Sequence, residues 1–297
     1  MTATSLRVHA NGLDHNVLEW LPDPSARPAG ARPASTVVLV HGFMDAGGTW
    51  DLVAPVLAEA GFRVLAPDMR GFGEGARTPA GSYYHFVDYV FDLADVIDQL
   101  SPGEPVALVG HSMGGTIATL FAGTFPERVA RLVIIEGIGP PDNPWESGPL
   151  RMRAWIEQVR IARDRGERRA TLAPDEARKR MAGNHPQVLP EVLAHRLPHL
   201  AEDVGGGRVA WRFDPLHRTT APMPFFAKLF VAFARNVTAP VLFVSGGALG
   251  FHPPDEDERL AAFATCERAE LADAGHMIHW TQPAALSELL LAHFAAR

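Results

Sequence analysis

Short runs of consecutive apolar and β-branched residues recur along the chain, and longer helix-like stretches separate them. Thr36–Val40 is a clear example, and such a run is typical of a strand that is covered on both faces. The other predicted strands are Phe62–Ala66, Val106–Val109, Leu132–Ile135, Val241–Val244 and Arg268–Leu271, and the predicted helices are Trp50–Ala60, Phe86–Leu100, Gly115–Phe125, Glu256–Phe263 and Ala284–Ala296. Alternation of buried strands with helices predicts a mostly parallel, doubly wound α/β sheet.

The N-terminal segment has a different pattern. Leu6–Ala10 and Asn16–Trp20 flank Asn11-Gly12, a dipeptide that favours the two-residue turn of a β-hairpin. A loop rich in proline, alanine and glycine, Pro22 to Pro33, follows this segment. We therefore expect an N-terminal hairpin that precedes the buried strands.

The alternation of strands and helices stops between Pro140 and about Pro240. This region is helix-like, contains several prolines and includes one short extended piece, Arg208–Phe213. We expect a core formed by residues 1–139 and 240–297, and a mainly helical cap of residues 140–239 inserted after the sixth strand. The aromatic residues of the cap are Trp145, Trp155, Trp211, Phe225, Phe226, Phe230 and Phe233. Most should pack within the cap, and a few could line an apolar pocket beneath it.

Composition limits the class of protein. The chain has 297 residues, of which 47% are hydrophobic, so it can bury a large core. Its net charge is −7 and it has no basic block, which argues against nucleic acid or an anionic membrane as a partner. Cys266 is the single cysteine, and no apolar run has the length of a signal sequence or a membrane span. We expect a cytoplasmic protein; the sequence does not indicate an oligomeric state.

Gly110–Gly114 has the pattern G-x-S-x-G, with Ser112 at its centre. A glycine-rich turn can give the same pattern, but here it follows the predicted strand Val106–Val109 and precedes the predicted helix Gly115–Phe125. That strand–turn–helix context is the one required by a nucleophile elbow. The serine of such an elbow has a strained backbone, and glycines allow the strand and helix to approach closely. Ser112 is therefore the predicted nucleophile.

A serine nucleophile needs a base to remove its proton. The chain has 13 histidines, so the choice depends on context. Gly275-His276 follows the last predicted strand and precedes the final helix, in the chain order serine, acid, histidine. His279 lies three residues further on and is the alternative. The preceding glycine favours His276 because it permits a tight approach to the serine.

The acid of the predicted triad is less obvious. The turn after the seventh strand, Ser245–Gly250, contains no carboxylate. The acids beyond it include Asp255 and Asp257, which also suit the first turn of a helix and remain alternatives. Glu136 directly follows the strand Leu132–Ile135, at the carboxyl edge of the sheet beside the strand of Ser112. A carboxylate buried there needs a partner, and an imidazolium can supply it, so Glu136 is the predicted acid.

Two further loops lie at the same edge of the predicted sheet. Gly42 lets the His41–Asp45 loop fold so that its amides face the site, and we expect the backbone N–H groups of Phe43 and Met113 to bind an oxyanion. His41 is expected to be structural, holding the loop by hydrogen bonds. Asp68–Gly71 should form a structural salt link or a turn cap.

Taken together, these motifs resemble the α/β-hydrolase superfamily over essentially the whole chain. The motifs are His41-Gly42, Asp68-x-Arg70-Gly71, Gly110–Gly114 and Gly275-His276. An acid after strand six is similar to the arrangement in haloalkane dehalogenases with glutamate there and in zearalenone-type lactonases. Glu136–Pro140 with Trp211–Pro215 resembles the serine-hydrolase-like branch. Dehalogenases and α/β-fold epoxide hydrolases use an aspartate nucleophile where this chain has Ser112, so both activities are disfavoured.

The triad and the resemblance predict a serine hydrolase that cleaves carboxylic esters, with a small apolar ester as substrate. The sequence shows neither a cluster of histidines and acids at metal-binding spacing nor a phosphate-binding Gly-Lys loop, so we expect no metal and no cofactor. Four alternatives remain open. The same residues could serve a lactonase, a carbon–carbon bond hydrolase or a cofactor-free perhydrolase, and the fold could also be a non-catalytic ligand-binding protein.

Overall fold

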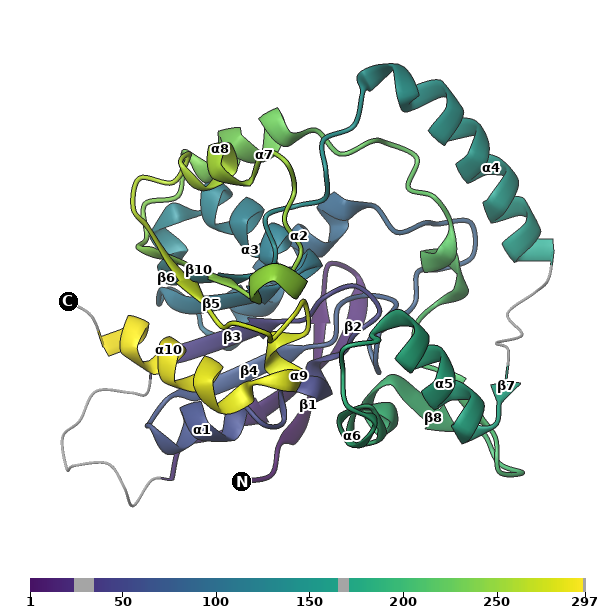
Figure 1. Ribbon diagram of the computed structural model, residues 1–297, viewed down its shortest axis with the longest axis horizontal. Helices are drawn as coiled ribbons and strands as arrows, with labels where there is room; N and C mark the ends of the chain where they lie inside the picture. Colours follow the sequence, from purple (N-terminus) through teal and green to yellow (C-terminus); the bar gives the residue numbers. More distant parts are fainter. Residues whose placement is uncertain (24–34, 165–170, 296–297) are drawn as a thin grey trace.

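The computed structural model describes residues 1–23, 35–164 and 171–295. Within these ranges one sheet has eight strands in the order β1-β2-β4-β3-β5-β6-β10-β11, with helices on both faces (Figure 1). The strands are β1 (Thr4–Ala10), β2 (Leu13–Trp20), β3 (Thr36–Val40), β4 (Arg63–Pro67), β5 (Val106–His111), β6 (Val129–Ile135), β10 (Val241–Ser245) and β11 (Cys266–Glu270). Residues 24–33 of the predicted loop from Pro22 to Pro33 lie outside the described residues.

Most strands of the sheet run parallel. The antiparallel pairs are β1 with β2, which form the expected hairpin, and β2 with β4. From β4 onward each neighbouring pair is parallel. The prediction of a mostly parallel, doubly wound sheet is therefore confirmed.

Two sets of helices cover the faces of the sheet. One face packs against α2 (Phe86–Leu100), α3 (Met113–Thr124) and α7 (Ala227–Ala234), and the other against α1 (Ala54–Glu59) and α10 (Pro283–Ala295) (Figure 1). Two short helices, α8 (Glu256–Leu260) and α9 (Ile278–Thr281), lie near the carboxyl edge of β10 and β11. Helices on both faces leave no face of the central strands exposed to solvent.

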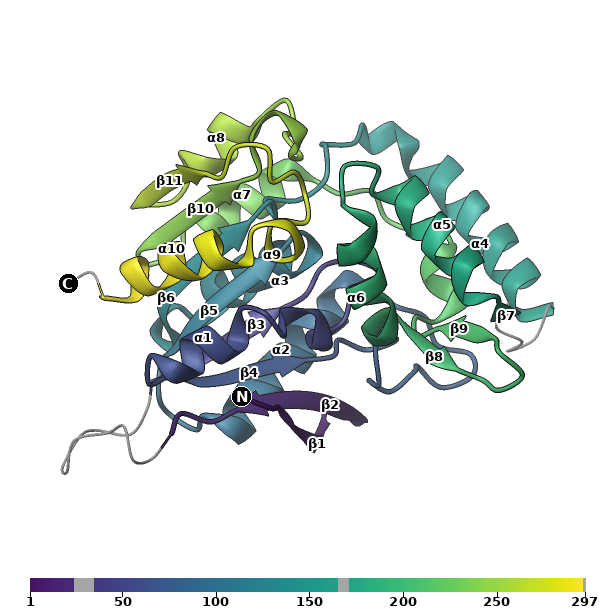
Figure 2. The ribbon, with the colours of Figure 1, turned by 60° about the horizontal axis from the view of Figure 1, so that its bottom comes forward.

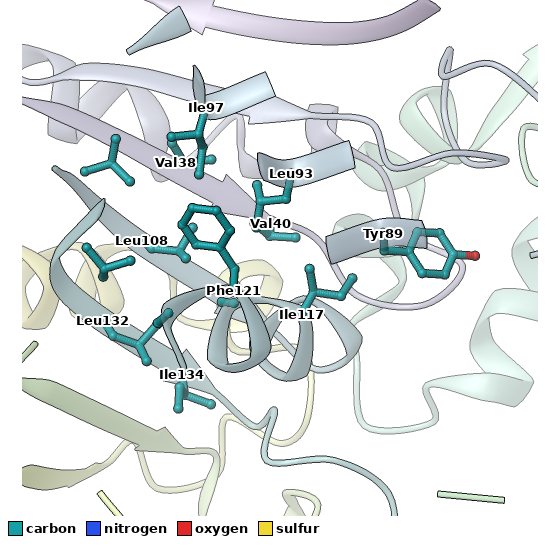
Figure 3. Packing of buried hydrophobic residues seen from close by; sticks show 14 of the residues in the cluster. Val38, Val40, Tyr89, Leu93, Ile97, Leu108, Ile117, Phe121, Leu132 and Ile134 are labelled. Atoms are coloured by element: carbon teal, nitrogen blue, oxygen red, sulfur yellow. The ribbon is translucent and has the colours of Figure 1, made fainter. Parts of the chain in front are cut away.

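Strand β3 shows why its sequence is an unbroken apolar run. Successive side chains of a strand point to opposite faces. Val38 and Val40 pack into the cluster formed with α2, α3 and α7, whereas Val37 and Leu39 pack into the cluster formed with α1 and α10. In the first cluster Phe121 of α3 lies among the side chains of the strands and of α2 (Figure 3). Both faces of β3 thus require apolar residues.

The predicted helix Trp50–Ala60 is shorter in the structure. A 3₁₀ turn at Gly47–Trp50 comes first, and α1 starts only at Ala54. Pro55 occupies the first turn of α1, where its missing N–H costs no intrahelical hydrogen bond, but a helix cannot continue backward through it without strain. The proline therefore separates Trp50, which is buried in the core, from the helix that follows.

The cap lies to one side of the core (Figure 2). It contains α4 (Gly148–Asp164), α5 (Pro174–Asn184), α6 (Pro190–Leu200) and a small antiparallel sheet of β7 (Thr171–Leu172), β9 (Val209–Trp211) and β8 (Ala201–Asp203). The predicted extended piece Arg208–Phe213 contains β9. Helix α7 also falls within residues 140–239, but it packs on core helix α3 so closely that a Cβ on Gly123 would lie 2.4 Å from the carbonyl oxygen of Phe233.

Asp51 of the core anchors the cap through helix α6. Its Oδ2 lies 2.7 Å from Nε2 of His195 and 3.1 Å from Nε2 of His199, and its Oδ1 pairs with the buried guanidinium of Arg196. Burial alone would raise the pKa of Asp51, but the hydrogen bond with His199 and the charge of Arg196 outweigh it and lower that pKa to about 2. Asp51 is therefore ionised at neutral pH and holds α6 against the core.

Among the helices of the described ranges, none combines the length and the apolar character needed to cross a bilayer.

Candidate active site

Ser112 occupies a sharp turn between β5 and α3, with φ 51° and ψ −117°. A positive φ is unfavourable for a residue with a side chain and persists only where the surroundings enforce it. The neighbouring glycines show why the turn can form. A Cβ on Gly110 would lie 2.3 Å from the carbonyl oxygen of Gly114, and one on Gly114 would lie 2.2 Å from that of Val40. The backbone thus has the elbow form that the sequence pattern predicts.

The predicted site residues all line one cavity of about 640 Å³. They come from separate parts of the chain and are Phe43, Ser112, Met113, Glu136 and His276. They meet because the loops that follow parallel strands gather at the carboxyl edge of the sheet. The structure therefore brings the predicted nucleophile, base, acid and oxyanion loops together.

Glu136 is 1% exposed and lies at the end of β6 with φ 52°. Its carboxylate accepts hydrogen bonds from the backbone N–H of Gly246, at 2.6 Å, and of Phe251. Nδ1 of His276 lies 3.4 Å from Oε2 of the same carboxylate. Two amides and one imidazole thus surround the buried charge, as a buried carboxylate requires.

The turn after β10, which contains no acid, has a role in this arrangement. It wraps around the carboxylate of Glu136 and supplies the amide of Gly246. A Cβ on Gly250 would lie 2.4 Å from Oε1 of Glu136, so the turn can close on the carboxylate only with glycine at that position. The turn after β10 therefore packs directly against the carboxylate that ends β6.

The alternative acids have other partners. Asp255 forms an ion pair with Arg259, 2.8 Å from Oδ1 to Nη2, and Asp257 pairs with Arg268 at 2.5 Å. Neither aspartate lines the cavity of Ser112. Nη1 of Arg259 donates to the backbone carbonyls of residues 138, 139 and 140, just beyond Glu136. Asp255 therefore binds Arg259, and Arg259 in turn holds the loop that follows Glu136. Asp255 itself does not line the cavity.

His276 lies in the loop between β11 and α9. Gly275 before it has φ 66°, and a Cβ on Gly246 would lie 2.1 Å from the carbonyl oxygen of Gly275, so both positions depend on glycine. The ring turns Nδ1 toward Glu136. This orientation leaves Nε2 as the ring nitrogen that does not face the carboxylate.

The alternative base, His279, does not line the cavity of Ser112. It is fully buried, its Nε2 lies 3.0 Å from Oδ2 of Asp45, and its ring packs on Trp50 at 4.5 Å between centroids. Burial lowers the pKa of His279, against the opposing effect of Asp45. Helix α9 starts at Ile278, after His276, so the two histidines share no helical face.

The structure places His41 as a loop-holding residue, as expected. Its Nε2 accepts a hydrogen bond from the backbone N–H of Met69 at 3.0 Å, so Nδ1 carries the proton and donates to the carbonyl oxygen of Gly42 at 2.7 Å. A Cβ on Gly42 would lie 2.7 Å from Nδ1 of His111 and 3.1 Å from Cβ of Ser112. Glycine at this position therefore lets the loop carrying Phe43 approach the nucleophile.

The expected oxyanion donors, Phe43 and Met113, line the same cavity as Ser112. Met113 is the first residue of α3, so its amide has no acceptor within the helix. Phe43 follows Gly42 and lines the same cavity, and its ring packs edge-on against His217 at 5.9 Å. The oxyanion role of their two amides stays a prediction.

Asp68 and Arg70 are both structural, but they do not pair with each other. Asp68 accepts hydrogen bonds from the backbone N–H of Gly47 at 2.7 Å and from that of Glu74 at 2.9 Å, so it caps turns. Arg70 forms ion pairs with Asp92 on helix α2 and, at 3.4 Å, with Asp88. The partner of Arg70 was not identifiable from the motif because it lies on the following helix.

The cavity has an aromatic wall, but the cap aromatics do not form it. Its aromatic lining comes from core segments and consists of Phe43, Tyr83, Tyr84, Phe86, Tyr89 and Phe251. The expectation that a few cap aromatics line the pocket was wrong. Phe230 packs into the main core, Trp211 stacks on Phe213 at 6.0 Å, and Trp145 is 76% exposed. These contacts depend on how the cap is placed, which the residue pattern did not reveal.

His217 and Arg151 are among the lining residues that were not singled out in the sequence. His217 stacks on Phe72 with 4.0 Å between ring centroids, and burial lowers the pKa of His217 to about 4, so the ring is neutral at pH 7. Arg151 lies in the first turn of α4 and also lines the cavity. No motif marks either residue, because each reaches the cavity only through the placement of the cap.

Two groups of histidine and aspartate were also missed, although no metal was expected. They are Asp45 with His111 and His279, and Asp51 with His195 and His199; in each group the nitrogen and oxygen atoms lie within 4.8 Å of one another. Hydrogen bonds link Asp45 to His279 and Asp51 to both of its histidines. The guanidinium of Arg196 at Asp51 also opposes a cation there. Hydrogen bonds therefore engage the aspartate of each group, whereas His111 bonds to the backbone carbonyl of His276.

A protein-family model described as the alpha/beta hydrolase fold matches residues 35–283. The chain therefore belongs to the alpha/beta hydrolase family. It is similar to a serine hydrolase-like protein of Dictyostelium discoideum, 34% identical over 118 residues, and to one of Danio rerio, 30% identical over 189 residues. The two matches cover 39% and 62% of this chain, but only 33% and 56% of those relatives.

Among solved structures, a hypothetical protein of Pseudomonas aeruginosa is similar with a TM-score of 0.84 and 26% sequence identity. The alignment covers 98% of this chain and 99% of that protein. The cap and the core are therefore both included in the structural similarity.

Proposed function

We propose that the protein is a serine hydrolase that cleaves carboxylic esters through an acyl-enzyme. The observation that carries this proposal is the buried carboxylate of Glu136, which faces Nδ1 of His276 in the cavity that Ser112 lines. A buried acid, an imidazole and a serine at a strained elbow are the elements of a catalytic triad. Membership of a hydrolase family and similarity to serine hydrolase-like proteins support the same conclusion.

In the first half of the reaction Ser112 attacks the acyl carbon of the ester. Nε2 of His276 takes the proton from the serine hydroxyl as the new bond forms. Glu136 holds the imidazole in the required tautomer and stabilises its charged form. The amides of Phe43 and Met113 bind the oxyanion, and His276 then gives its proton to the departing alcohol.

In the second half water replaces the alcohol. His276 removes a proton from the water, which attacks the acyl carbon, and the carboxylic acid leaves as Ser112 regains its proton. A cavity of about 640 Å³ is of the size that encloses a small organic molecule. The chain's own residues can therefore carry out every proton transfer of ester hydrolysis.

Replacement of the nucleophile tests this function. Ser112→Ala should abolish hydrolysis of p-nitrophenyl acylates, whereas Ser82→Ala, at an exposed serine outside the cavity, should retain wild-type rates. Full esterase activity in Ser112→Ala would contradict the mechanism. A substrate panel separates the esterase from the alternatives. Lactones test for a lactonase, vinylogous diketones test for a carbon–carbon bond hydrolase, and peroxide with acetate tests for a perhydrolase. Failure of the wild type on every substrate, with no label on Ser112, would instead favour a ligand-binding protein.

A further inference from the structure

The cavity wall contains one arginine, Arg151, in the first turn of α4. Its Nε is buried and has no hydrogen-bond partner, and within the described ranges the side chain forms no ion pair. Arg153, two residues further along the same helix, is exposed and pairs with Glu157 at 3.1 Å. Arg151 therefore differs from Arg153 in two ways: its side chain lines the cavity, and no carboxylate among the described residues pairs with it.

Arg151 as a whole is half-buried, and Nε is its buried donor that lacks a partner. The guanidinium keeps its charge at every physiological pH and carries five N–H donors. Buried polar groups in native proteins are nearly always hydrogen-bonded, because an unpaired one costs free energy. The one carboxylate on the cavity wall belongs to Glu136, which the two backbone amides and His276 already surround. Nothing on the wall therefore neutralises Arg151.

We propose that Arg151 forms an anion-binding subsite for a carboxylate of the substrate. This inference rests on the proposed function and narrows its substrate class to esters that carry one free carboxylate on the acyl or the alcohol part. The planar guanidinium matches a carboxylate with two parallel hydrogen bonds. The free carboxylate of the substrate is unchanged by the reaction, and its binding to Arg151 positions the ester group against Ser112.

The rest of the wall limits the remainder of the substrate. Among the described lining residues, Arg151 is the single group with a permanent positive charge, so one negative charge balances it. A phosphate, which carries up to two negative charges, would leave charge uncompensated. The aromatic lining, including Tyr83, Phe86 and Phe251, suits an apolar body. The expected substrate is therefore apolar along most of its length and acidic at one end.

Matched substrate pairs test the subsite. Monomethyl adipate and methyl adipamate differ in having a carboxylate or a neutral amide at the end of the acyl chain. Butyryloxyacetate and butyryloxyacetamide place the same difference on the alcohol part. We expect the wild type to have the higher kcat/KM for the carboxylate of at least one pair. In Arg151→Gln that preference should fall by about 10- to 100-fold, mainly through KM, as is typical for loss of a charged hydrogen bond.

Two further variants separate charge from packing. Arg151→Lys should keep part of the preference, because lysine retains the charge but not the planar fork. Arg153→Gln, on the same helix but outside the cavity, should keep the full preference. Equal kcat/KM values within both pairs in the wild type, or an unchanged preference in Arg151→Gln, would overturn the proposal. Preference for the phosphate analogue, butyryloxyethyl phosphate, over both carboxylates would also overturn it.

A binding measurement distinguishes failure of the subsite from failure of the proposed function. Calorimetry of both carboxylate substrates with Ser112→Ala requires no hydrolysis. At least one should bind, and the double variant Ser112→Ala/Arg151→Gln should bind it at least about tenfold more weakly. If binding depends on Arg151 but the wild type hydrolyses no ester, the proposed function fails and the subsite stands. If hydrolysis by Ser112 occurs but binding is independent of Arg151, the subsite fails.

Discussion

The backbone carbonyl of His276 accepts a hydrogen bond from Nε2 of His111 at 2.8 Å. His111 directly precedes the proposed nucleophile Ser112, so this bond connects the loop of the proposed base to the strand that carries the elbow. Burial, with His279 and His276 nearby, holds the pKa of His111 well below its usual value. The ring is thus neutral at pH 7, and Nε2 carries its proton because the carbonyl can only accept.

Loss of this bond should affect catalysis more than substrate binding. His111→Leu removes the donor, and we expect kcat to fall about 2- to 10-fold with a smaller change in KM, because a net hydrogen bond contributes about 0.5–1.5 kcal/mol. His111→Gln offers an amide N–H in its place and should recover part of the rate. Steady-state kinetics on a p-nitrophenyl ester, with thermal unfolding as a check of folding, gives the answer. A wild-type kcat in His111→Leu would show that the bond does not position His276.

Glu136 and Asp255 should respond differently to neutralisation. Glu136→Gln should lower kcat by up to about 10⁴-fold, the loss found when the acid of a serine-protease triad is replaced by its amide. Asp255→Asn should leave kcat close to that of the wild type but lower the melting temperature, because Asp255 pairs with the buried Arg259. Both variants are measured side by side for kcat and Tm. Loss of activity in Asp255→Asn alone would reject Glu136 as the acid.

Gly42→Ala should disturb the oxyanion loop without touching a triad side chain. The added methyl group would lie 2.7 Å from Nδ1 of His111 and 3.1 Å from Cβ of Ser112, so the loop carrying Phe43 must shift. Removal of one oxyanion donor costs about 10²–10³ in kcat, and we expect a loss approaching that range. Gly183→Ala, where no atom lies within 4 Å of the added Cβ, is the matched control. Equal rates in the two variants would exclude this role for the loop.

The contribution of Asp51 to stability should depend on pH. Its pKa is about 2 in the folded protein and about 3.9 in an unfolded chain. A carboxyl group whose pKa is lower in the folded protein stabilises the fold fully at pH values above its unfolded pKa. That stabilisation is lost as the pH falls through its folded pKa. The difference in free energy of unfolding between wild type and Asp51→Asn should therefore be largest above about pH 4, fall steeply toward pH 2 and vanish below it. His195, His199 and Arg196 are the side chains that face this carboxylate.

Urea unfolding at a series of pH values measures this difference. Asp14→Asn is the control, because Asp14 pairs with His9 at 2.8 Å on the exposed surface, where such pairs contribute little. A difference between wild type and Asp51→Asn that stays constant from pH 7 to pH 2 would contradict the anchoring of α6 by the ionised carboxylate.

The sheet could be predicted because its determinants are local. A strand such as β3 is covered on both faces, so each of its positions must be apolar and the run is visible in the sequence. The elbow at Ser112 is equally local, since its glycines are needed within the turn itself. Glu136 could be chosen because the turn after β10 contains no acid, and the structure adds that this turn binds the carboxylate by an amide.

Other features depend on contacts between distant segments. The burial of His279 against Asp45 follows from the packing of α9 on the loop after β3, and nothing around His279 in the sequence indicates it. The same holds for Arg151 and His217, which reach the cavity only because the cap lies over the sheet edge. A few cap aromatics were expected to line the pocket, but none does. Their positions in the sequence give no information on the orientation of the cap.

We propose that Ser112 is the nucleophile of a triad with His276 and Glu136. Reaction with a fluorophosphonate, followed by intact mass measurement and peptide mapping, examines this role, since the reagent phosphonylates activated serines. We expect a single adduct on Ser112, formed in parallel with loss of esterase activity, absent from Ser112→Ala and formed much more slowly in Glu136→Gln. Esterase activity that persists while Ser112 is fully labelled, or an adduct on another serine that accounts for the inhibition, would contradict it.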